Sequence, residues 1–307
     1  MSAPTRTHSP ADSSPAADAA RPAPRSEVPT TSRRTRRDWS APIAYLIALV
    51  VCGITIAPVV YVIIGGFRTT AQINRDPSGW PDPWVFDKYL AVFTNPGFWT
   101  QFANSSIVAL ATTTGVVVLG VMAAFVIARY EFFGRGFLFS LFTAGLLFPL
   151  TVAVLPLFTM LRGFGLLGNL MAVIAPQVAF ALPTTIIILV PFLRAIPAEL
   201  EDAAVIDGAS RFTFFLRVLL PLSWPGLVTV GVLAFVASWN AYLLPLLLLG
   251  NPATATLPVG VQYFSTAYSQ DTAGVLAFTS IAMLPALLFF TLAQRRIVGG
   301  LTGAVKG

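Results

Sequence analysis

Four acidic side chains lie within nine positions of an otherwise apolar chain. They are Glu199, Glu201, Asp202 and Asp207, four of the 13 acidic residues among 307. Carboxylates clustered in this way could be catalytic groups, or they could form a charged docking surface. The residues that accompany them elsewhere in the sequence favour docking.

Most of the side chains that enzymes use are missing. The single histidine, His8, lies near the N-terminus, so neither histidine-based catalysis nor a pair of histidine metal ligands is expected. Cys52 is the single cysteine, which excludes a disulfide or a cysteine-ligated metal cluster within the chain. We therefore predict that the chain is not an enzyme and binds no metal or other cofactor.

A nucleotide site is also missing from the sequence. A phosphate-binding loop of the type GxxxxGK[ST] uses a lysine to reach the phosphates. The chain has two lysines, Lys88 and Lys306, and neither follows such a loop. The chain is therefore not expected to hydrolyse ATP by that route.

The composition is that of a membrane protein. Hydrophobic residues make up 56% of the chain and charged residues 10%, whereas soluble domains carry about 25% charged residues. Apolar segments long enough to cross the ~30 Å hydrocarbon core as helices occur at about residues 42–66, 99–128, 137–161, 168–193, 224–249 and 272–294. The sequence predicts an all-α membrane protein with six transmembrane helices. Because no acid, histidine or arginine lies in these segments, a proton-relay transporter is disfavoured.

The distribution of basic residues predicts the orientation in the membrane. Twelve of the 19 lysines and arginines fall on one predicted side and four on the other, and the richer side is cytoplasmic. Both termini and a loop at 195–222 are thus expected in the cytoplasm. We attribute the net charge of +6 to topology and contact with anionic lipid, and predict no nucleic-acid partner. Residues 1–38, rich in Ala, Pro and Ser, are expected to be a disordered tail ahead of a transmembrane domain at 39–307.

Local signals divide the loop at 195–222 into two short helices. The first is expected to begin near Pro197, which places three of the four acids at its positive N-terminal end. Gly208 allows the chain to turn, Ser210 can cap the second helix, and Pro221 should end or kink it. These patterns fit two interpretations, a loop lying on the membrane surface or a rigid knob for a soluble partner.

The loop also resembles a known motif. Its segment is ELEDAAVIDGASRFTFFLRVLLPL, similar to the EAA loop of ATP-binding-cassette import permeases, in which EAA is followed by three residues, Gly, nine residues, Ile, one residue and Leu-Pro. The matching positions are Asp202, Ala203, Ala204, Gly208, Val218, Leu220 and Pro221. Asp replaces the Glu of the pattern, and Val replaces its Ile.

Three further segments resemble the carbohydrate, or maltose-type, branch of these permeases, in particular its smaller subunit. They are NSSIVALATT (104–113), SWNAYLLPLLLL (238–249) and the terminal RRIVGGLTGAVKG. The resemblance covers about residues 40–307. It implies a multi-pass subunit of the cell membrane that forms half of a sugar path and works with a second permease, an ATPase dimer that binds ATP and Mg, and an extracytoplasmic solute-binding protein.

The resemblance also implies roles for individual residues. The first short helix would be a coupling helix held in a cleft of the ATPase, with contacts from Glu199, Glu201, Asp202, Ala203, Ala204, Asp207, Gly208 and Pro221. Mechanical coupling of this kind requires that ATP binding favour one conformation over another.

Polar residues within or beside the spans are candidates for the translocation path: Asn104, Gln177, Trp239, Asn240 and Tyr242. A Trp ring can stack on the apolar face of a sugar, and Asn can both donate to and accept from hydroxyls. Alternatively, Gln177 and Asn240 bond neighbouring backbone. At the level of the whole protein two alternatives stay open, a permease of the same class for another solute such as a polyamine or phosphate, and an ATP-independent channel or carrier.

Overall fold

The computed structural model describes residues 40–264 and 270–304, and the predicted tail at 1–38 lies outside these ranges. The chain divides into two compact units, residues 1–51 and 52–307. The described part of the first unit is the beginning of helix α1, whose side chains at 42–51 are exposed. All contacts described below lie within the second unit.

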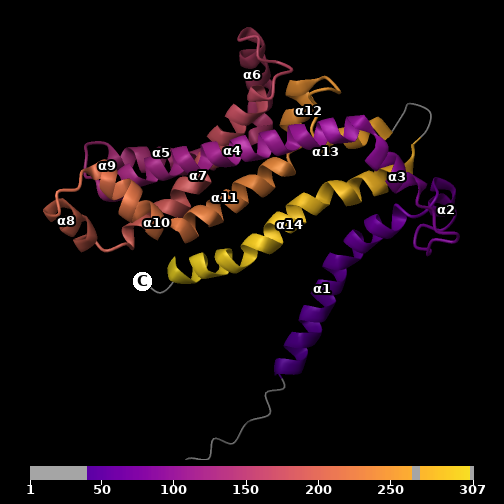
Figure 1. Ribbon diagram of the computed structural model, residues 1–307, viewed down its shortest axis with the longest axis horizontal. Coiled ribbons are helices and arrows are strands. Elements are labelled where there is room, and N and C mark those ends of the chain that lie inside the picture. Colours follow the sequence, from indigo (N-terminus) through magenta and orange to yellow (C-terminus); the bar gives the residue numbers. More distant parts are fainter. Residues whose placement is uncertain (1–39, 265–269, 305–307) are drawn as a thin grey trace, which may run out of the picture. The chain divides into compact units, whose positions relative to one another are not determined.

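The described residues are mainly helical, which confirms the predicted fold class (Figure 1). The helices are α1 (Ser40–Gly65), α2 (Thr70–Arg75), α3 (Asp87–Thr94), α4 (Pro96–Arg129), α5 (Arg135–Gly145), α6 (Leu150–Gly163), α7 (Met171–Arg194), α8 (Glu199–Ile206), α9 (Arg211–Phe214), the π-helical η1 (Phe215–Leu219), α10 (Leu220–Leu222), α11 (Trp224–Trp239), α12 (Leu243–Leu249), α13 (Leu257–Gly260), the 3-10 helix η2 (Val261–Phe264) and α14 (Thr272–Ala304).

Helices α4, α7 and α11 form the centre of the second unit, since each packs against the other two (Figure 1). α14 packs on α11, and α5 packs on α7. Gly120 allows the close approach of α4 to α7, because a Cβ atom there would lie 2.4 Å from the Thr185 methyl group. Small residues commonly let transmembrane helices pack closely in this way.

Four of the six predicted spans correspond to single helices, α1, α4, α7 and α14, each long and apolar enough to cross a membrane. The third predicted span, 137–161, is instead divided into α5 and α6, which meet at 98°. Pro149 precedes α6. A proline disfavours helical conformation in the residue before it, which explains why α5 does not continue into α6.

The fifth predicted span, 224–249, is likewise not one helix. α11 ends at Trp239, and α12 begins at Leu243. Pro245 lies in the first turn of α12, where its missing N–H is tolerated, but its ring would clash with the carbonyl of Ala241 if the helix continued from α11. Residues 211–222 and α11 meet at 75°. Among the described residues there are thus four long apolar helices, or six spans if each bent pair is counted as one.

Arg68 organises the segment that connects α1 to α3. Its side chain is buried, and its guanidinium donates to the carbonyls of Gln72 (2.8 Å), Asp76 (2.5 Å) and Pro77 (3.1 Å). The guanidinium therefore binds carbonyl groups at and just after the end of α2, two of which also accept backbone hydrogen bonds from Asp76 and Gly79.

Asp271 joins α14 to α2 and α3. It accepts hydrogen bonds from Lys88 Nζ (2.7 Å), Thr70 Oγ1 (3.0 Å) and the Gly274 amide (3.1 Å). Burial alone would raise the pKa of the Asp271 carboxyl, but the hydrogen bonds from Lys88, Gly274 and Thr70 and the charge of Lys88 outweigh it, so the pKa is lowered. The ion pair therefore favours the folded state while the carboxyl is ionised.

Asp271→Asn should lower the melting temperature of the purified protein at pH 7, and the difference from wild type should shrink as the pH falls below about 4. Asn retains an acceptor for the helix N-terminus, so the substitution removes the ion pair and the hydrogen bond with Lys88 while keeping this contact. A depressed folded-state pKa contributes stability above the unfolded value and loses it as pH falls through the folded value. Because the pair is about one-third exposed, the effect at pH 7 should be below ~1 kcal/mol.

The measurement is thermal unfolding in detergent between pH 7 and pH 3. Asp82→Asn, at an exposed site, serves as a control and should change the melting temperature less. A difference between Asp271→Asn and wild type that persisted unchanged to pH 3 would contradict the assignment.

Candidate functional site

The predicted loop forms a short helix with an acidic first turn. α8 spans Glu199–Ile206, and Glu199, Glu201 and Asp202 occupy its first turn. Asp207 follows the last residue of the helix. Of the four acids, Glu201 is half-buried and the others are exposed. This arrangement presents negative charge to solvent at the end of the helix where a carboxylate is stabilised.

Gly208 closes α8 in a Schellman motif. Its φ of +77° lies in the left-handed region that favours glycine. The Gly208 amide donates to the Val205 carbonyl (3.0 Å), and the Ala209 amide donates to the Ala204 carbonyl (2.8 Å). Ser210 Oγ then accepts from the Thr213 amide (3.1 Å) and caps α9. The turn and the cap follow the local sequence signals.

Pro221 does not end the second helix. It follows the π-helical turn at Phe215–Leu219, in which the Leu220 amide donates to the Phe215 carbonyl. A wider turn makes room for the proline ring, which in a regular helix would clash with the carbonyl of Arg217. The direction of the chain changes near Ser223, between α10 and α11.

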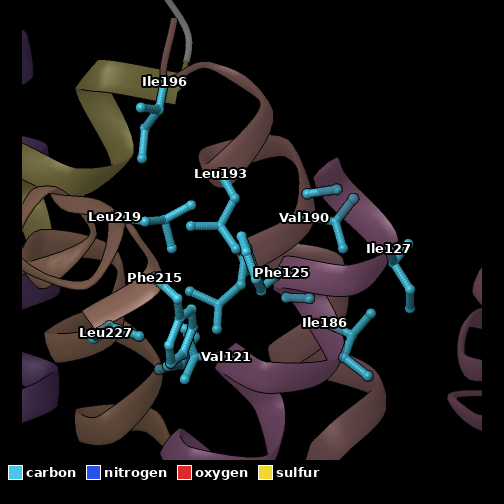
Figure 2. Packing of buried hydrophobic residues seen from close by; sticks show 14 of the residues in the cluster. Val121, Phe125, Ile127, Ile186, Val190, Leu193, Ile196, Phe215, Leu219 and Leu227 are labelled. Carbon is cyan, nitrogen blue, oxygen red and sulfur yellow. The ribbon is translucent and has the colours of Figure 1, made fainter. Parts of the chain in front are cut away.

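A hydrophobic cluster anchors the loop to the helix bundle. Phe215 and Leu219 of η1 pack among Phe125 of α4 and Leu193 of α7, together with Leu227 of α11 (Figure 2). Leu219 and Leu193 are fully buried. Of the predicted small contact residues, Ala204 packs against this cluster, whereas Ala203 is exposed. A displacement of the loop would therefore act directly on α4, α7 and α11.

Three residues that the sequence did not single out hold the base of the loop. Arg129 donates to the Ile196 carbonyl (2.8 Å), and the Arg211 guanidinium lies 4.9 Å from the Tyr130 ring centroid. Burial and the charge of Glu201 raise the pKa of Tyr130, more than Arg211 and Arg129 lower it. The one available signal was the position of Arg129 and Tyr130 directly after a long apolar segment.

α8 also exposes apolar side chains. Val205 is 61% exposed and Ile206 is 85% exposed, and Phe212 of α9 is 69% exposed. Large apolar side chains grouped beside acids on a short helix can contact a partner's pocket while the acids meet its basic residues. The geometry therefore supports docking.

A cavity of about 540 Å³ lies among α4, α6, α7, α11 and α12. This volume is within the ~300–1,000 Å³ range of small-molecule pockets. Its lining residues are Thr112, Leu150, Gln177, Phe180, Ala181, Thr184, Thr185, Ile188, Val230, Leu233, Ala234, Ala237, Ser238, Ala241, Tyr242, Leu243 and Leu244.

Helical spacing explains which residues reach the cavity. On α7 they recur at 177, 180, 181, 184, 185 and 188, and on α11 at 230, 233, 234, 237 and 238. This is the three-and-four spacing of one helix face. Several of these residues are Ala, Ser or Thr, whose short side chains leave space between the helices.

Three helices share a hydrogen-bond group at the cavity wall. Gln177 Oε1 of α7 accepts from Thr112 Oγ1 of α4 (3.1 Å) and from Ser238 Oγ of α11 (2.5 Å). The Gln177 Nε2 atom is buried and has no hydrogen-bond partner among the described residues. Gln177 therefore lines the cavity with other atoms, and its unpartnered donor lies within the wall.

The predicted path residues divide into two groups. Gln177 and Tyr242 line the cavity, whereas Asn104, Trp239 and Asn240 do not. Asn104 donates to the Ala253 and Ala255 carbonyls (3.0 Å each), and Asn240 donates to the Val236 carbonyl (3.0 Å) of its own helix.

Trp239 is buried, and its Nε1 donates to the Ala282 carbonyl (3.1 Å). Its ring stacks with that of Phe235, with centroids 5.7 Å apart, so neither face is presented to this cavity. Asn104 and Asn240 thus bond to backbone carbonyls, and Trp239 bonds to a backbone carbonyl and packs against a neighbouring ring.

Sequence reasoning missed Thr112, Phe180 and Ser238 as cavity residues. Ser238 immediately precedes Trp239 in the same segment. Neighbouring residues in a helix point about 100° apart, so choosing the larger side chain selected the wrong face of α11. Stepping along the chain by three and four from Gln177 would have found Phe180 and Ala181.

Comparisons with known proteins agree with this architecture. The family model described as "Binding-protein-dependent transport system inner membrane component" matches residues 115–302. The chain is 35% identical to the diacetylchitobiose uptake system permease protein NgcG of Streptomyces coelicolor, over 85% of this chain and 87% of that protein. It is 38% identical to the trehalose transport system permease protein SugB of Mycobacterium tuberculosis, over 84% of this chain and 94% of that protein.

A solved structure has the same fold. A chain of a bacterial ABC transporter involved in the import of the acidic polysaccharide alginate superposes with a TM-score of 0.73 at 21% identity, covering 85% of this chain and 98% of that one. The family match spans more than half of the sequence, and the relatives match over most of both chains. The chain therefore belongs to the family of inner-membrane components of binding-protein-dependent transport systems.

Proposed function

We propose that this chain is a permease subunit of an ATP-dependent sugar importer. The relatives NgcG and SugB are named for the uptake of diacetylchitobiose and trehalose. The observation that carries the proposal is the continuity between loop and cavity. Val230 lines the cavity and belongs to the buried cluster that anchors the loop, and Ile188 lines the cavity and packs against that cluster.

In this proposal the loop transmits motion from a separate ATPase. The exposed acids of α8, together with Val205 and Ile206, contact a cleft of the ATPase subunit. The small side chain of Ala203 allows the ATPase to approach closely, and that of Ala204 allows α8 to pack closely on the cluster. Gly208 sets the turn, and Pro221, behind the π-helical turn, keeps η1 against the cluster. ATP binding then favours one of two conformations, because the two ATPase states bind α8 differently.

The assembly that this function requires contains a second permease, two ATPase subunits and an extracytoplasmic solute-binding protein. ATP and Mg belong to the ATPase. We place the chain in the cell membrane with both termini and the loop in the cytoplasm, as the distribution of basic residues predicts. Gln177 and Tyr242 lie on the path. Asn104, Trp239 and Asn240 lie outside it and hydrogen-bond to backbone carbonyls.

The experiment is transport in vesicles that contain the chain with its partner subunits. Radiolabelled diacetylchitobiose and trehalose should enter only when ATP and the solute-binding protein are both supplied. Phosphate and spermidine serve as non-sugar probes. Uptake without ATP would indicate a carrier or channel, and uptake of phosphate or spermidine instead of sugar would indicate another solute class. Either outcome would overturn the proposal.

A further inference from the structure

We propose that the C-terminal end of α4 sets the orientation of α8 before an ATPase docks, and that Arg129 and Tyr130 are the positioning residues. The two are neighbours in the chain, yet they contact the segments on both sides of α8. The inference rests on the proposed function, because it concerns the helix that docks in that function. It adds that this helix has a preset orientation, which docking alone does not require.

Arg129 holds the chain where it enters α8. α7 ends at Arg194, and α8 begins at Glu199. In the connection between them, the Ile196 carbonyl accepts a hydrogen bond from Arg129 Nη2 (2.8 Å), a contact that spans 67 positions of the chain. The described residues form no other hydrogen bond to this carbonyl. Because a hydrogen bond from a charged donor is stronger than one between neutral groups, Arg129 fixes the connection just before α8.

Tyr130 contacts the chain where it leaves α8. The Arg211 guanidinium of α9 lies 4.9 Å from the centroid of the Tyr130 ring, which is a cation–π contact. The same ring packs edge-on against Phe125 (centroids 5.3 Å apart), and Phe125 contacts Phe215 of η1 (4.9 Å; Figure 2). The Tyr130 hydroxyl is buried and has no hydrogen-bond partner among the described residues. The ring, and not the hydroxyl, therefore makes these contacts.

α8 itself lies against the same end of α4. Ala204 of α8 and Tyr130 both pack against the buried cluster. Burial, and after it the charge of Glu201, raises the pKa of Tyr130, so this acid of α8 is close enough to the ring to interact electrostatically. The segment is thus held at its entry, along its length and at its exit. Contacts at both ends of a short helix restrict its rotation, whereas a contact at one end would let it pivot.

A fixed α8 has two consequences for the proposed importer. Order that exists before docking lowers the entropic cost of binding the ATPase. α4 also reaches the cavity, where it contributes Thr112, so a force on α8 acts on the cavity wall through one helix. An α8 that pivoted on α4 would absorb that force. The two residues should therefore affect the coupling of ATP hydrolysis to import rather than the folding of the bundle.

The first test measures the orientation of α8 in the full chain alone, in lipid nanodiscs. Cys52→Ala removes the single cysteine, and spin labels are attached at Ile107→Cys of α4 and Val205→Cys of α8, both exposed. Ile107 lies about 33 Å along α4 from Arg129, a separation suited to pulsed electron paramagnetic resonance. The wild-type distance distribution should be narrow. Arg129→Met should broaden it roughly twofold or more, because other orientations become populated when the charged donor is lost.

Matched variants separate these contacts from a general effect of charge or volume. Arg135→Met is the control for Arg129→Met, because the Arg135 guanidinium donates to the Ala128 carbonyl (3.3 Å) at the same helix end rather than to the loop. It should leave the distribution narrow. Arg129→Lys keeps a charged donor and should restore most of the wild-type width. Tyr130→Leu, which removes the ring beside Arg211, should broaden the distribution, whereas Tyr130→Phe, which keeps the ring, should not.

The second test measures the sugar imported per ATP hydrolysed by the complete transporter. Arg129→Met should lower this ratio roughly tenfold, the effect of losing one hydrogen bond to a charged group. Its melting temperature should stay close to that of wild type. Arg129→Lys should recover most of the ratio, and Arg135→Met should not change it. A residue needed only for stability would instead lower the melting temperature and reduce import and hydrolysis together.

Each result decides for or against the proposal. A broadened distribution and a lowered ratio in Arg129→Met, both restored by Arg129→Lys, support it. A narrow distribution or a normal ratio in Arg129→Met would overturn it, as would a parallel loss of import, hydrolysis and stability. If Arg129→Met does not fold, Tyr130→Leu replaces it in both measurements, and wild-type values there would overturn the proposal. If the wild-type transporter imports no sugar, the proposed function fails, while the distance measurement still decides whether α4 orients α8.

Discussion

Gly208→Trp should abolish sugar-stimulated ATP hydrolysis by the complete transporter while leaving membrane insertion intact. Gly208 has a φ of +77° and closes the Schellman motif after α8. A residue with a Cβ atom loses about 1–2 kcal/mol in this conformation, so α8 would change its orientation relative to α9. A bulky indole would also protrude beside the surface that we assign to ATPase docking. No neighbouring atom lies within 4 Å of the added Cβ, so the bundle itself should be unaffected.

Gly134→Trp is the matched control for this experiment. Gly134 also has a left-handed conformation, with φ of +86°, and also has open space around it. It precedes α5 rather than α8. Phosphate release in vesicles with and without sugar should show coupling in Gly134→Trp and none in Gly208→Trp. Loss of coupling in both variants would indicate general backbone strain, and normal coupling in Gly208→Trp would contradict the role of the loop.

Ile206→Asp should weaken association with the ATPase subunits by roughly 30-fold or more, which is the effect of losing a binding hot spot worth about 2 kcal/mol. Ile206 is 85% exposed at the end of α8, so an aspartate there costs the isolated permease little. In the docked state the same aspartate would enter an apolar contact without a counter-charge. The large effect on binding and the small effect on folding distinguish a docking residue from a packing residue.

The measurement is the dissociation constant of the ATPase for the permease in detergent, with the melting temperature of the permease alone measured in parallel. Phe133→Asp provides the control, since Phe133 is also a fully exposed apolar residue but lies between α4 and α5. The Ile206 assignment would be wrong if both variants bound the ATPase as wild type does.

Much of the helical framework follows from local sequence. The segments that form α1, α4, α7 and α14 are recognisable because each is long and apolar. A segment of this kind forms a helix in a membrane because the helix pairs its backbone groups internally. The two segments that break, at Pro149 and before Pro245, contain no charged residue and are mostly apolar. Hydropathy is averaged over a window, and so it does not register a bend caused by one proline ring. The bend requires knowledge of where the flanking helices pack.

In the candidate sites, too, local features could be predicted and contacts between distant helices could not. The turn at Gly208 and the cap at Ser210 were predictable, because each depends on hydrogen bonds within four or five residues. The contact of Gln177 with Thr112 and Ser238 was not predictable. These two residues are 65 and 61 positions from Gln177 and meet it only when α4, α7 and α11 pack. Trp239 had suitable chemistry for a sugar path, but the packing turned its ring toward Phe235 and away from the cavity.

The sequence by itself determined that this protein belongs in a membrane, that its chain lacks a phosphate-binding loop, and that Glu199, Glu201 and Asp202 lie on a short helix that Gly208 closes. Those properties depend on composition and on short-range hydrogen bonds. Only the tertiary structure decided that the cluster around Leu219 joins this loop to the cavity wall, and that Gln177 meets Thr112 and Ser238 there. Such contacts depend on which helix faces meet, and that is set by the packing of the whole bundle rather than by any one segment.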